Sequence, residues 1–346
     1  MDLKLAFIGF GNVARAFTRI LDIRRSQLAD RYGITWRATA IATGRHGCIT
    51  SVEGIDLTEA ARCVESGLSL STLPGTSLKE RALETVESCE ADLLFETTPL
   101  NPDDGEPAVT IIRRALERSM NVVTANKGPV AFAYRELRAL ASERKVSFRF
   151  EGTVMDGAPI FNLVERCLPA TKVTGFSGLL NSTTNLILTG MEEGRSFASC
   201  LVEAQRAGIA EANADYDIDG WDAAVKAVAL ANVLMSADLR PKDVERSGIR
   251  DLTQAEVARA HQSGGAIRLV SRARTTESGL KMSALPEILA PASPLASARG
   301  TSNILMIETD LMGEIAVFEH EPGIEQTAYA LLSDLISVHK DAARGH

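Results

Sequence analysis

The 346-residue sequence lacks the features of several classes of protein. Its five cysteines are scattered and odd in number, with no CxxC or CxxH pair, which argues for reduced thiols and against a zinc site. Aromatic residues are only 5%, and no basic run interrupts a net charge of −8, so no nucleic-acid surface is expected. No segment approaches the ~18–20 apolar residues of a membrane span. We therefore expect a cytoplasmic, soluble protein that binds neither membrane nor nucleic acid.

The composition that is present is typical of a folded globular chain. Hydrophobic residues make up 45% and charged residues 24%, and the length predicts two domains. The short apolar run at residues 2–10 ends in GFGN, without a cleavage site. We interpret it as a first strand and not as a signal peptide.

The segment LKLAFIGFGNVARAF predicts a strand, a tight turn and a helix. Gly9 and Gly11 would allow a sharp turn and the approach of a pyrophosphate, and Ala14 is small enough for close packing of helix on strand. An isolated GxGxxA can also be an ordinary turn, but its position between an apolar strand and an amphipathic helix favours dinucleotide binding. The expected cofactor contacts here are Gly9, Phe10, Gly11, Asn12 and Val13.

The next predicted strand ends in Thr43-Gly44-Arg45-His46. Enzymes confined to NAD usually carry Asp or Glu at this point, to bind the ribose 2′-hydroxyl. Thr43, Arg45 and His46 instead offer groups suited to a 2′-phosphate. The interpretation favours NADP and leaves NAD open; the alternative is a polar loop that contains an arginine by chance.

The rest of the amino-terminal half predicts two surface helices within 57–86, a buried strand at 91–96, a helix at 106–118, a strand at 121–125, a helix at 130–145 and a strand at 146–150. Together they would complete a doubly wound unit near residue 150. Ligands bind at the carboxyl ends of strands in such sheets. Thr97, Thr98, Asn126 and Lys127 follow strand ends and are therefore further candidates for cofactor contacts.

An acidic stretch from Glu211 to Lys226 leads into an Ala-rich segment that predicts a helix. Asp222 and Lys226 are four residues apart and so share one helix face. A carboxylate there could hold an ammonium group while the lysine moves a proton. The alternative is a solvated ion pair at the start of a helix.

Five motifs occur in the order seen in homoserine dehydrogenases: GFGNVA, TANKGP at 124–129, EGTVMDGAPI at 151–160, GLLNSTTNLIL at 178–188 and E-x₁₀-D-x₃-K at 211–226. The chain resembles a short form of that family, without its regulatory domain. The resemblance implies an α/β protein with a Rossmann-type doubly wound nucleotide domain at 1–150 and an α+β catalytic and dimerisation domain at 151–311. It also implies a segment, 312–346, whose last helix returns to the nucleotide domain.

The resemblance implies reduction of aspartate 4-semialdehyde to homoserine with NADPH or NADH, by a homodimer. Two alternatives remain: a related dehydrogenase acting on another amino or oxo acid, and a nucleotide sensor. No DNA-reading module in the sequence supports the sensor.

The site residues are assigned from the matching motif positions. Lys226 matches the proton-transferring lysine, and Lys127 matches a lysine over the reacting centre. Hydride transfer to an aldehyde leaves negative charge on oxygen, so a cation or proton donor is needed there. The expected substrate contacts are Glu211 and Asp222, for the amino group, with Thr183 and Asn181.

Two further assignments rest on loops that depart from the family pattern. Some members bind a monovalent cation, Na⁺ or K⁺, in the loop that matches Glu151–Gly157, which gives Glu151, Val154 and Asp156 as candidate ligands. Here Met155 and Asp156 replace small residues, and Asp156 could instead cap the following helix. Gly323, kept from a glycine-rich stretch, is expected beside the nicotinamide; the alternative is an ordinary loop.

Overall fold

The computed structural model describes residues 2–344 and divides the chain into two compact units. Among the described residues, the first unit combines residues 2–159 with 323–344, and the second unit is residues 160–322. The predicted domain boundaries after residues 150 and 311 fall earlier than these. A short 3₁₀ helix at Glu151–Thr153 packs on the last helix, and a strand at Glu314–Glu319 pairs within the second sheet, so both segments lie on the other side of the predicted boundaries.

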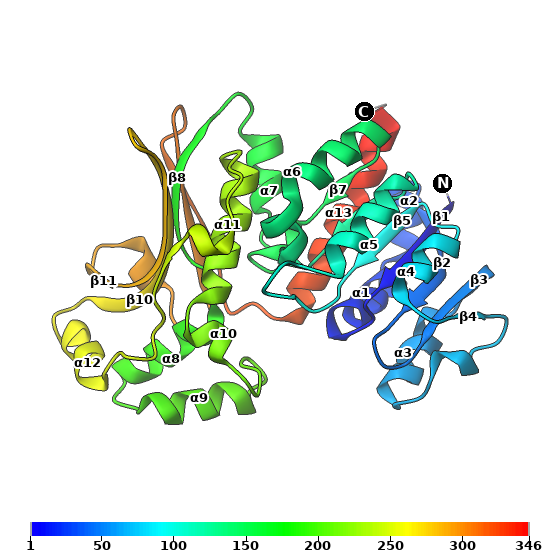
Figure 1. Cartoon of the computed structure of the whole chain (residues 1–346). Helices are drawn as coiled ribbons and strands as arrows, with labels where there is room; N and C mark the ends of the chain where they lie inside the picture. Colours follow the sequence, from blue (N-terminus) through cyan, green and yellow to red (C-terminus); the bar gives the residue numbers. More distant parts are fainter. Residues whose placement is uncertain (1, 345–346) are drawn as a thin grey trace. The chain divides into compact units, whose positions relative to one another are not determined.

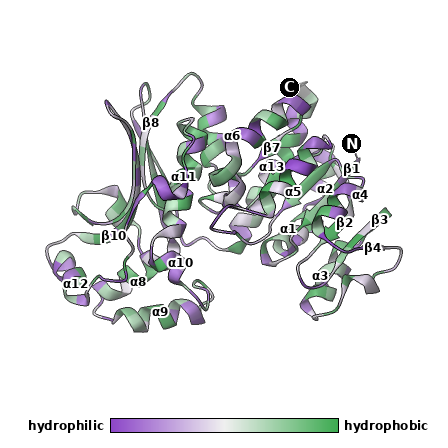
Figure 2. Cartoon of the chain, in the orientation of Figure 1, coloured by the Kyte–Doolittle hydropathy of each residue, from purple (hydrophilic) through white to green (hydrophobic). Residues whose placement is uncertain are grey.

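The first unit contains a seven-stranded sheet in the order β4-β3-β2-β1-β5-β6-β7 (Figure 1). Five strands are parallel: β1 (Asp2–Ile8), β2 (Thr35–Ala42), β5 (Leu93–Glu96), β6 (Asn121–Thr124) and β7 (Phe148–Arg149). Figure 2 shows β2 as largely hydrophobic, and most residues of β1, β2 and β5 are buried, as expected for strands covered on both faces. The doubly wound fold predicted from the sequence is confirmed.

Helices of this unit pack on the sheet in two groups. Strand order reverses between β1 and β5, so right-handed crossovers place α1 and α5 on opposite faces. α1 packs with α13, and α5 packs with α6. The helices are α1 (Asn12–Ile23), α2 (Arg25–Tyr32), α3 (Leu57–Glu65), α4 (Ala82–Ser88), α5 (Ala108–Glu117), α6 (Lys127–Arg144) and α13 (Ile324–Arg344).

The segment between β2 and β5 differs from the prediction of two helices alone. β3 (Cys48–Ile55) and β4 (Ser77–Lys79) add an antiparallel edge to the sheet. β3 carries polar and glycine residues, SVEG, and β4 has only three residues, so neither gives the apolar alternation that marks a strand in sequence.

The second unit contains a six-stranded sheet, ordered β13-β12-β8-β10-β11-β9 and antiparallel except for the β11–β9 pair. α8, α11 and α12 pack against β10. The strands are β8 (Val173–Leu179), β9 (Glu245–Arg246), β10 (Ala266–Thr276), β11 (Gly279–Leu289), β12 (Asn303–Thr309) and β13 (Glu314–Glu319). The helices are α7 (Ile160–Asn162), α8 (Ser182–Glu192), α9 (Phe197–Arg206), α10 (Asp215–Ile218), α11 (Trp221–Leu234) and α12 (Gln254–Gln262).

Candidate active site

The β1–α1 turn has the geometry of a dinucleotide-binding loop. Gly9 has φ +85°, and a Cβ there would lie 2.6 Å from the carbonyl carbon of Thr97. The Thr97 hydroxyl also donates to the Gly9 carbonyl, at 2.9 Å. Gly11 directly precedes α1, and a Cβ there would meet nothing within 4 Å. The turn is therefore tight at Gly9 and open at Gly11, where a phosphate can approach the first N–H groups of α1.

The other residues predicted at this turn fall into two groups. Phe10 is buried and packs edge-to-face on Phe7, with ring centroids 5.9 Å apart, so its side chain belongs to the core. Asn12 is exposed and accepts a hydrogen bond from Arg15 Nη2 at 2.7 Å. Val13 is half-buried at the start of α1. Phe10 can thus offer a ligand only its backbone.

The turn between β2 and β3 leaves one cationic side chain exposed. The Thr43 hydroxyl donates to the Gly47 carbonyl (3.0 Å) and accepts from the His46 N–H (2.7 Å). The His46 ring lies 3.0 Å from the Leu68 carbonyl. Arg45 is exposed, and within residues 2–344 no hydrogen bond or ion pair holds its guanidinium. Of the three predicted residues, Arg45 is the one whose side chain is available to a ligand.

The ends of β5 and β6 meet in a buried polar network. Asn126 is the N-cap of α6, where its Oδ1 accepts from the Gly128 N–H at 2.9 Å, and Lys127 is the first residue of that helix. Asn126 Nδ2 also donates to the Thr98 hydroxyl at 3.4 Å. The predicted cofactor residues of the two strand ends are therefore linked.

A fully buried carboxyl group, which the sequence prediction missed, lies at the centre of this network. Glu96, the last residue of β5, is 0% exposed. Burial raises its pKa, while hydrogen bonds from Thr98, Thr124 and Asn126 oppose that shift. The one available signal was a charged residue that ends an otherwise apolar strand, ADLLFE.

In the second unit, Asn181 joins two carboxylates. As the N-cap of α8 it accepts from the Thr184 N–H at 2.8 Å, so its amide group faces away from the helix. Its Nδ2 then donates to Asp217 Oδ1 (2.8 Å) and to Asp222 Oδ2 (2.9 Å). The predicted substrate residues Asn181 and Asp222 are 41 positions apart in the sequence, and the fold brings their side chains into hydrogen-bonding contact.

Lys226 lies at the same place, one turn along α11 from Asp222. Its Nζ is 3.5 Å from Asp222 Oδ2 and donates to the Leu180 carbonyl at 2.5 Å. The lysine side chain is 16% exposed and the aspartate 8%. The alternative of a solvated surface pair is wrong, because both side chains are largely buried and share a polar cluster.

Asp217, on α10, is a member of this cluster that the prediction did not single out. Burial raises its pKa above the ordinary 3.8, and the neighbouring Asp222 carboxylate raises it further. Hydrogen bonds from Asn181 and Thr183, and the Lys226 charge, act in the opposite direction. In the sequence, Asp217 is one of several carboxylates in a single acidic stretch, and nothing there distinguishes it from its neighbours.

The framework of the cluster is held at the far end of α8. Glu192 there is buried and bonds to the fully buried Arg268 at 2.5 Å and to Arg299 at 2.7 Å. An ion pair of this kind requires good geometry to offset desolvation, so it fixes α8 in one position. That position in turn fixes Asn181 at the helix start.

Two other predicted substrate residues differ in their surroundings. Thr183 is buried on the first turn of α8, with its hydroxyl 3.4 Å from the Ile209 carbonyl. Glu211 is exposed on the loop after α9, where its backbone carbonyl accepts from Gln205 at 3.2 Å. In the part of the chain that the structure describes, no hydrogen bond or ion pair joins the Glu211 carboxylate to the cluster.

The predicted cation loop and Gly323 both lie in the first unit. Glu151 and Val154 are buried, and the Glu151 N–H donates to Asp334 on α13 at 2.9 Å. Asp156 accepts from the Thr327 hydroxyl at 2.8 Å, so its carboxylate already ties this loop to α13. Gly323 is exposed just before α13. Between residues 2 and 344 no group of three or more His, Cys, Asp or Glu residues has the arrangement of a metal site.

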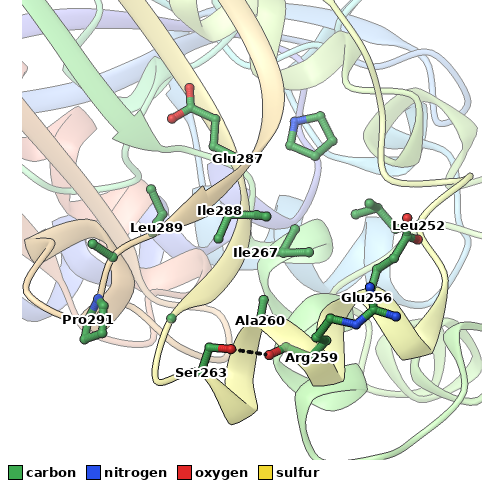
Figure 3. A pocket seen from close by; sticks show the side chains of 13 residues that line it. Leu252, Glu256, Arg259, Ala260, Ser263, Ile267, Glu287, Ile288, Leu289 and Pro291 are labelled. Carbon is green, nitrogen blue, oxygen red and sulfur yellow. Dashed lines mark hydrogen bonds between the residues drawn. The ribbon is translucent and has the colours of Figure 1, made fainter.

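A separate groove of about 680 Å³ lies between α12 and strands β10 and β11 (Figure 3). Glu256 and Arg259 line it from α12, and Ile288 lines it from β11. None of the predicted site residues contributes to it.

No helix among the described residues is long and apolar enough to cross a membrane.

Comparisons with known proteins identify the family of the chain. The family model for homoserine dehydrogenase matches residues 159–336. The chain is 37% identical to the NAD(+)-dependent homoserine dehydrogenase of Pseudomonas canavaninivorans, over 99% of this chain and 98% of that protein. It is 34% identical to the homoserine dehydrogenase of Methanocaldococcus jannaschii, over 99% and 100%.

Solved structures give the same result. The homoserine dehydrogenase of Thermoplasma acidophilum superposes with a TM-score of 0.83 at 26% identity, covering 98% of this chain and 100% of that one. A hyperthermophilic archaeal homoserine dehydrogenase in complex with NADPH gives 0.82 at 30% identity, covering 98% of each.

The fold and the relatives define the class of the chain as an NAD(P)-dependent oxidoreductase. The glycine turn on the doubly wound sheet has the features of a cofactor site, and the carboxylate–lysine cluster is the candidate site for a small polar substrate. Within this class, the chain belongs to the homoserine dehydrogenase family.

Proposed function

We propose that the chain interconverts L-homoserine and L-aspartate 4-semialdehyde with a nicotinamide cofactor, and that Lys226 carries the proton. The observation that carries this proposal is the Asn181–Asp217–Asp222–Lys226 cluster. Reduction of NAD⁺ or NADP⁺ by the purified chain in the presence of L-homoserine is the test.

Lys226 is suited to the proton step because its amino group is held in a fixed position. A nicotinamide cofactor, when bound, would supply the hydride for aldehyde reduction and would accept it in the reverse direction. The developing alkoxide oxygen needs a proton, which the Lys226 ammonium donates; in the reverse direction the neutral amine removes the hydroxyl proton. The Leu180 carbonyl and Asp222 hold Nζ in one place, which limits the reorganisation required at the moment of transfer.

The two carboxylates give the site its preference for an amino acid. Burial raises the pKa of Asp217, and the neighbouring Asp222 carboxylate raises it further, because two negative charges are held close together. An ammonium group bound between them would relieve this repulsion. We propose that Asp217 and Asp222 bind the substrate amino group, that Thr183 and Asn181 complete the contacts, and that Glu211 joins them when substrate binds.

We propose NADP as the preferred cofactor, with the 2′-phosphate bound by Arg45. The 43–47 turn contains no carboxylate that would accept from a ribose 2′-hydroxyl, and Arg45 is its exposed cation. The relatives include both an NAD(+)-dependent enzyme and a complex with NADPH, so the family accommodates either cofactor.

Replacement of Arg45 by alanine is expected to raise KM for NADP⁺ at least about tenfold, because a charged hydrogen bond to phosphate contributes ~1.5–3 kcal/mol. KM for NAD⁺, which has no 2′-phosphate, should change little. Steady-state kinetics with each cofactor measure the effect, and Arg31→Ala, an exposed arginine on α2, is a matched control. If Arg45→Ala raised KM equally for NADP⁺ and NAD⁺, Arg45 would not be the residue that binds the 2′-phosphate.

The other proposals follow the family resemblance. Lys127 acts at the reacting centre, Gly323 lies beside the nicotinamide, and the second unit, residues 160–322, forms the catalytic and dimerisation domain of a cytoplasmic homodimer. A Na⁺ or K⁺ ion held by Glu151, Val154 and Asp156 would require the loop at 151–157 to offer further carbonyl oxygens, since the Asp156 carboxylate is engaged by Thr327.

A further inference from the structure

Glu96 lies in the buried interior of the first sheet, where an apolar side chain would be expected. It ends β5 in the middle of the first sheet, paired with Ile8 of β1 on one side and Thr124 of β6 on the other. Its side chain is completely buried, and within residues 2–344 no lysine, arginine or histidine forms an ion pair with it. Burying a carboxyl group without a cation is costly, and an apolar side chain would fill the same space without that cost.

The hydrogen bonds of Glu96 extend to both neighbouring loops. Oε1 accepts from the backbone N–H of Thr98 at 2.8 Å and from the hydroxyl of the same residue. Oε2 accepts from the Thr124 hydroxyl at 2.7 Å. One carboxyl group therefore connects the loop that follows β5 to the end of β6.

Each of these contacts continues to a predicted cofactor residue. The Thr124 hydroxyl accepts from the Asn126 N–H at 2.9 Å, and Asn126 caps α6, whose first residue is Lys127. On the other side, Thr98 follows Thr97, whose hydroxyl holds the Gly9 carbonyl in the β1–α1 turn. The Glu96 carboxyl group is thus the common anchor of the two strand-end loops.

We propose that Glu96 is a positioning residue, which fixes the Thr97–Thr98 loop and the start of α6 in the geometry that cofactor binding and Lys127 require. It acts through Thr98 and Thr124 and does not itself contact the substrate. The inference rests on the proposed function, because it assigns these two loops to the cofactor and the reaction.

Three variants test the role. Glu96→Leu removes the acceptors, whereas Glu96→Gln keeps one carbonyl acceptor for Thr98 and presents an NH₂ group that can donate to the Thr124 hydroxyl. Thr39→Val is the matched control: Thr39 is also buried in this sheet, and its hydroxyl donates to the Glu90 carbonyl at 2.7 Å, remote from the strand-end network. Glu96→Leu and Thr39→Val each remove a buried polar group from the same sheet, but only the substitution at Glu96 alters the two loops.

We expect Glu96→Leu to lower kcat by about 10- to 100-fold, since small displacements of reacting groups have effects of that size. KM for the cofactor should rise as well. Glu96→Gln should recover most of kcat, and Thr39→Val should keep the wild-type kcat even if its melting temperature falls. Hydrogen exchange of peptides that span 97–100 and 126–130 should accelerate in Glu96→Leu and not in Thr39→Val, because the Thr98 and Gly128 N–H bonds depend on the network.

The outcomes separate this inference from the proposed function. A folded Glu96→Leu variant with wild-type kcat, cofactor KM and exchange rates would overturn the positioning role while the wild-type enzyme remains active. If Thr39→Val lost as much kcat as Glu96→Leu, the effect would be one of general stability and the inference would fail. Hydrogen exchange reports on the loops even if wild type does not turn over homoserine; unchanged exchange in that case overturns the inference independently.

Discussion

Replacement of Lys226 by alanine is expected to lower kcat for homoserine oxidation by about 10²- to 10⁴-fold, the range for loss of a positioned acid or base. KM for homoserine should change much less, because Asp217 and Asp222 remain to bind the amino group. Lys226→Arg should fail similarly. Arginine keeps the positive charge beside Asp222 but does not release its proton at the pH of the assay.

The control for Lys226 is Lys281→Ala, which removes an exposed lysine from β11 of the same unit and should leave kcat unchanged. Melting temperatures of all variants show whether lost activity reflects unfolding. A folded Lys226→Ala or Lys226→Arg enzyme with kcat close to that of wild type would contradict the proton-transfer role.

The two glycines of the β1–α1 turn should respond in opposite ways to substitution. Gly9→Ala places a methyl group 2.6 Å from the Thr97 backbone and forces a non-glycine residue to φ +85°. It should lower the free energy of unfolding by at least about 2 kcal/mol. Gly11→Ala meets no protein atom within 4 Å, so stability should stay near that of wild type.

Cofactor affinity gives a second measurement for the substitution at Gly11. The open space at Gly11 is where a pyrophosphate approaches, so Gly11→Ala should weaken NADPH binding at least about tenfold, which corresponds to ~1.4 kcal/mol. Denaturant unfolding and cofactor fluorescence titration measure the two effects. If Gly11→Ala bound NADPH like wild type, the turn would not be the phosphate site.

The parts of the fold that local pattern determines were predictable. The β1–α1 turn requires glycine, and its sequence shows glycine. Asp222 and Lys226 lie on one face of α11 because an α-helix has 3.6 residues per turn. The structure places Lys226 Nζ 3.5 Å from Asp222 Oδ2.

The parts that depend on distant contacts were not predictable. Asp217 enters the cluster because the side chains of Asn181 and Thr183 reach it from α8. Glu96 is buried because β1 and β6 flank it in the sheet, and no local pattern encodes that placement. Conversely, Glu211 stands out in the sequence motif, but the described hydrogen bonds leave its carboxylate outside the cluster. Its substrate role remains a prediction.

The most direct measurement is the absorbance at 340 nm during incubation of the wild-type chain with L-homoserine and either NADP⁺ or NAD⁺ at alkaline pH. Homoserine-dependent reduction of the cofactor is the predicted result, with NADP⁺ preferred and activity lost in Lys226→Ala. A wild-type protein that binds NADPH tightly but reduces neither cofactor with homoserine would contradict the proposed function.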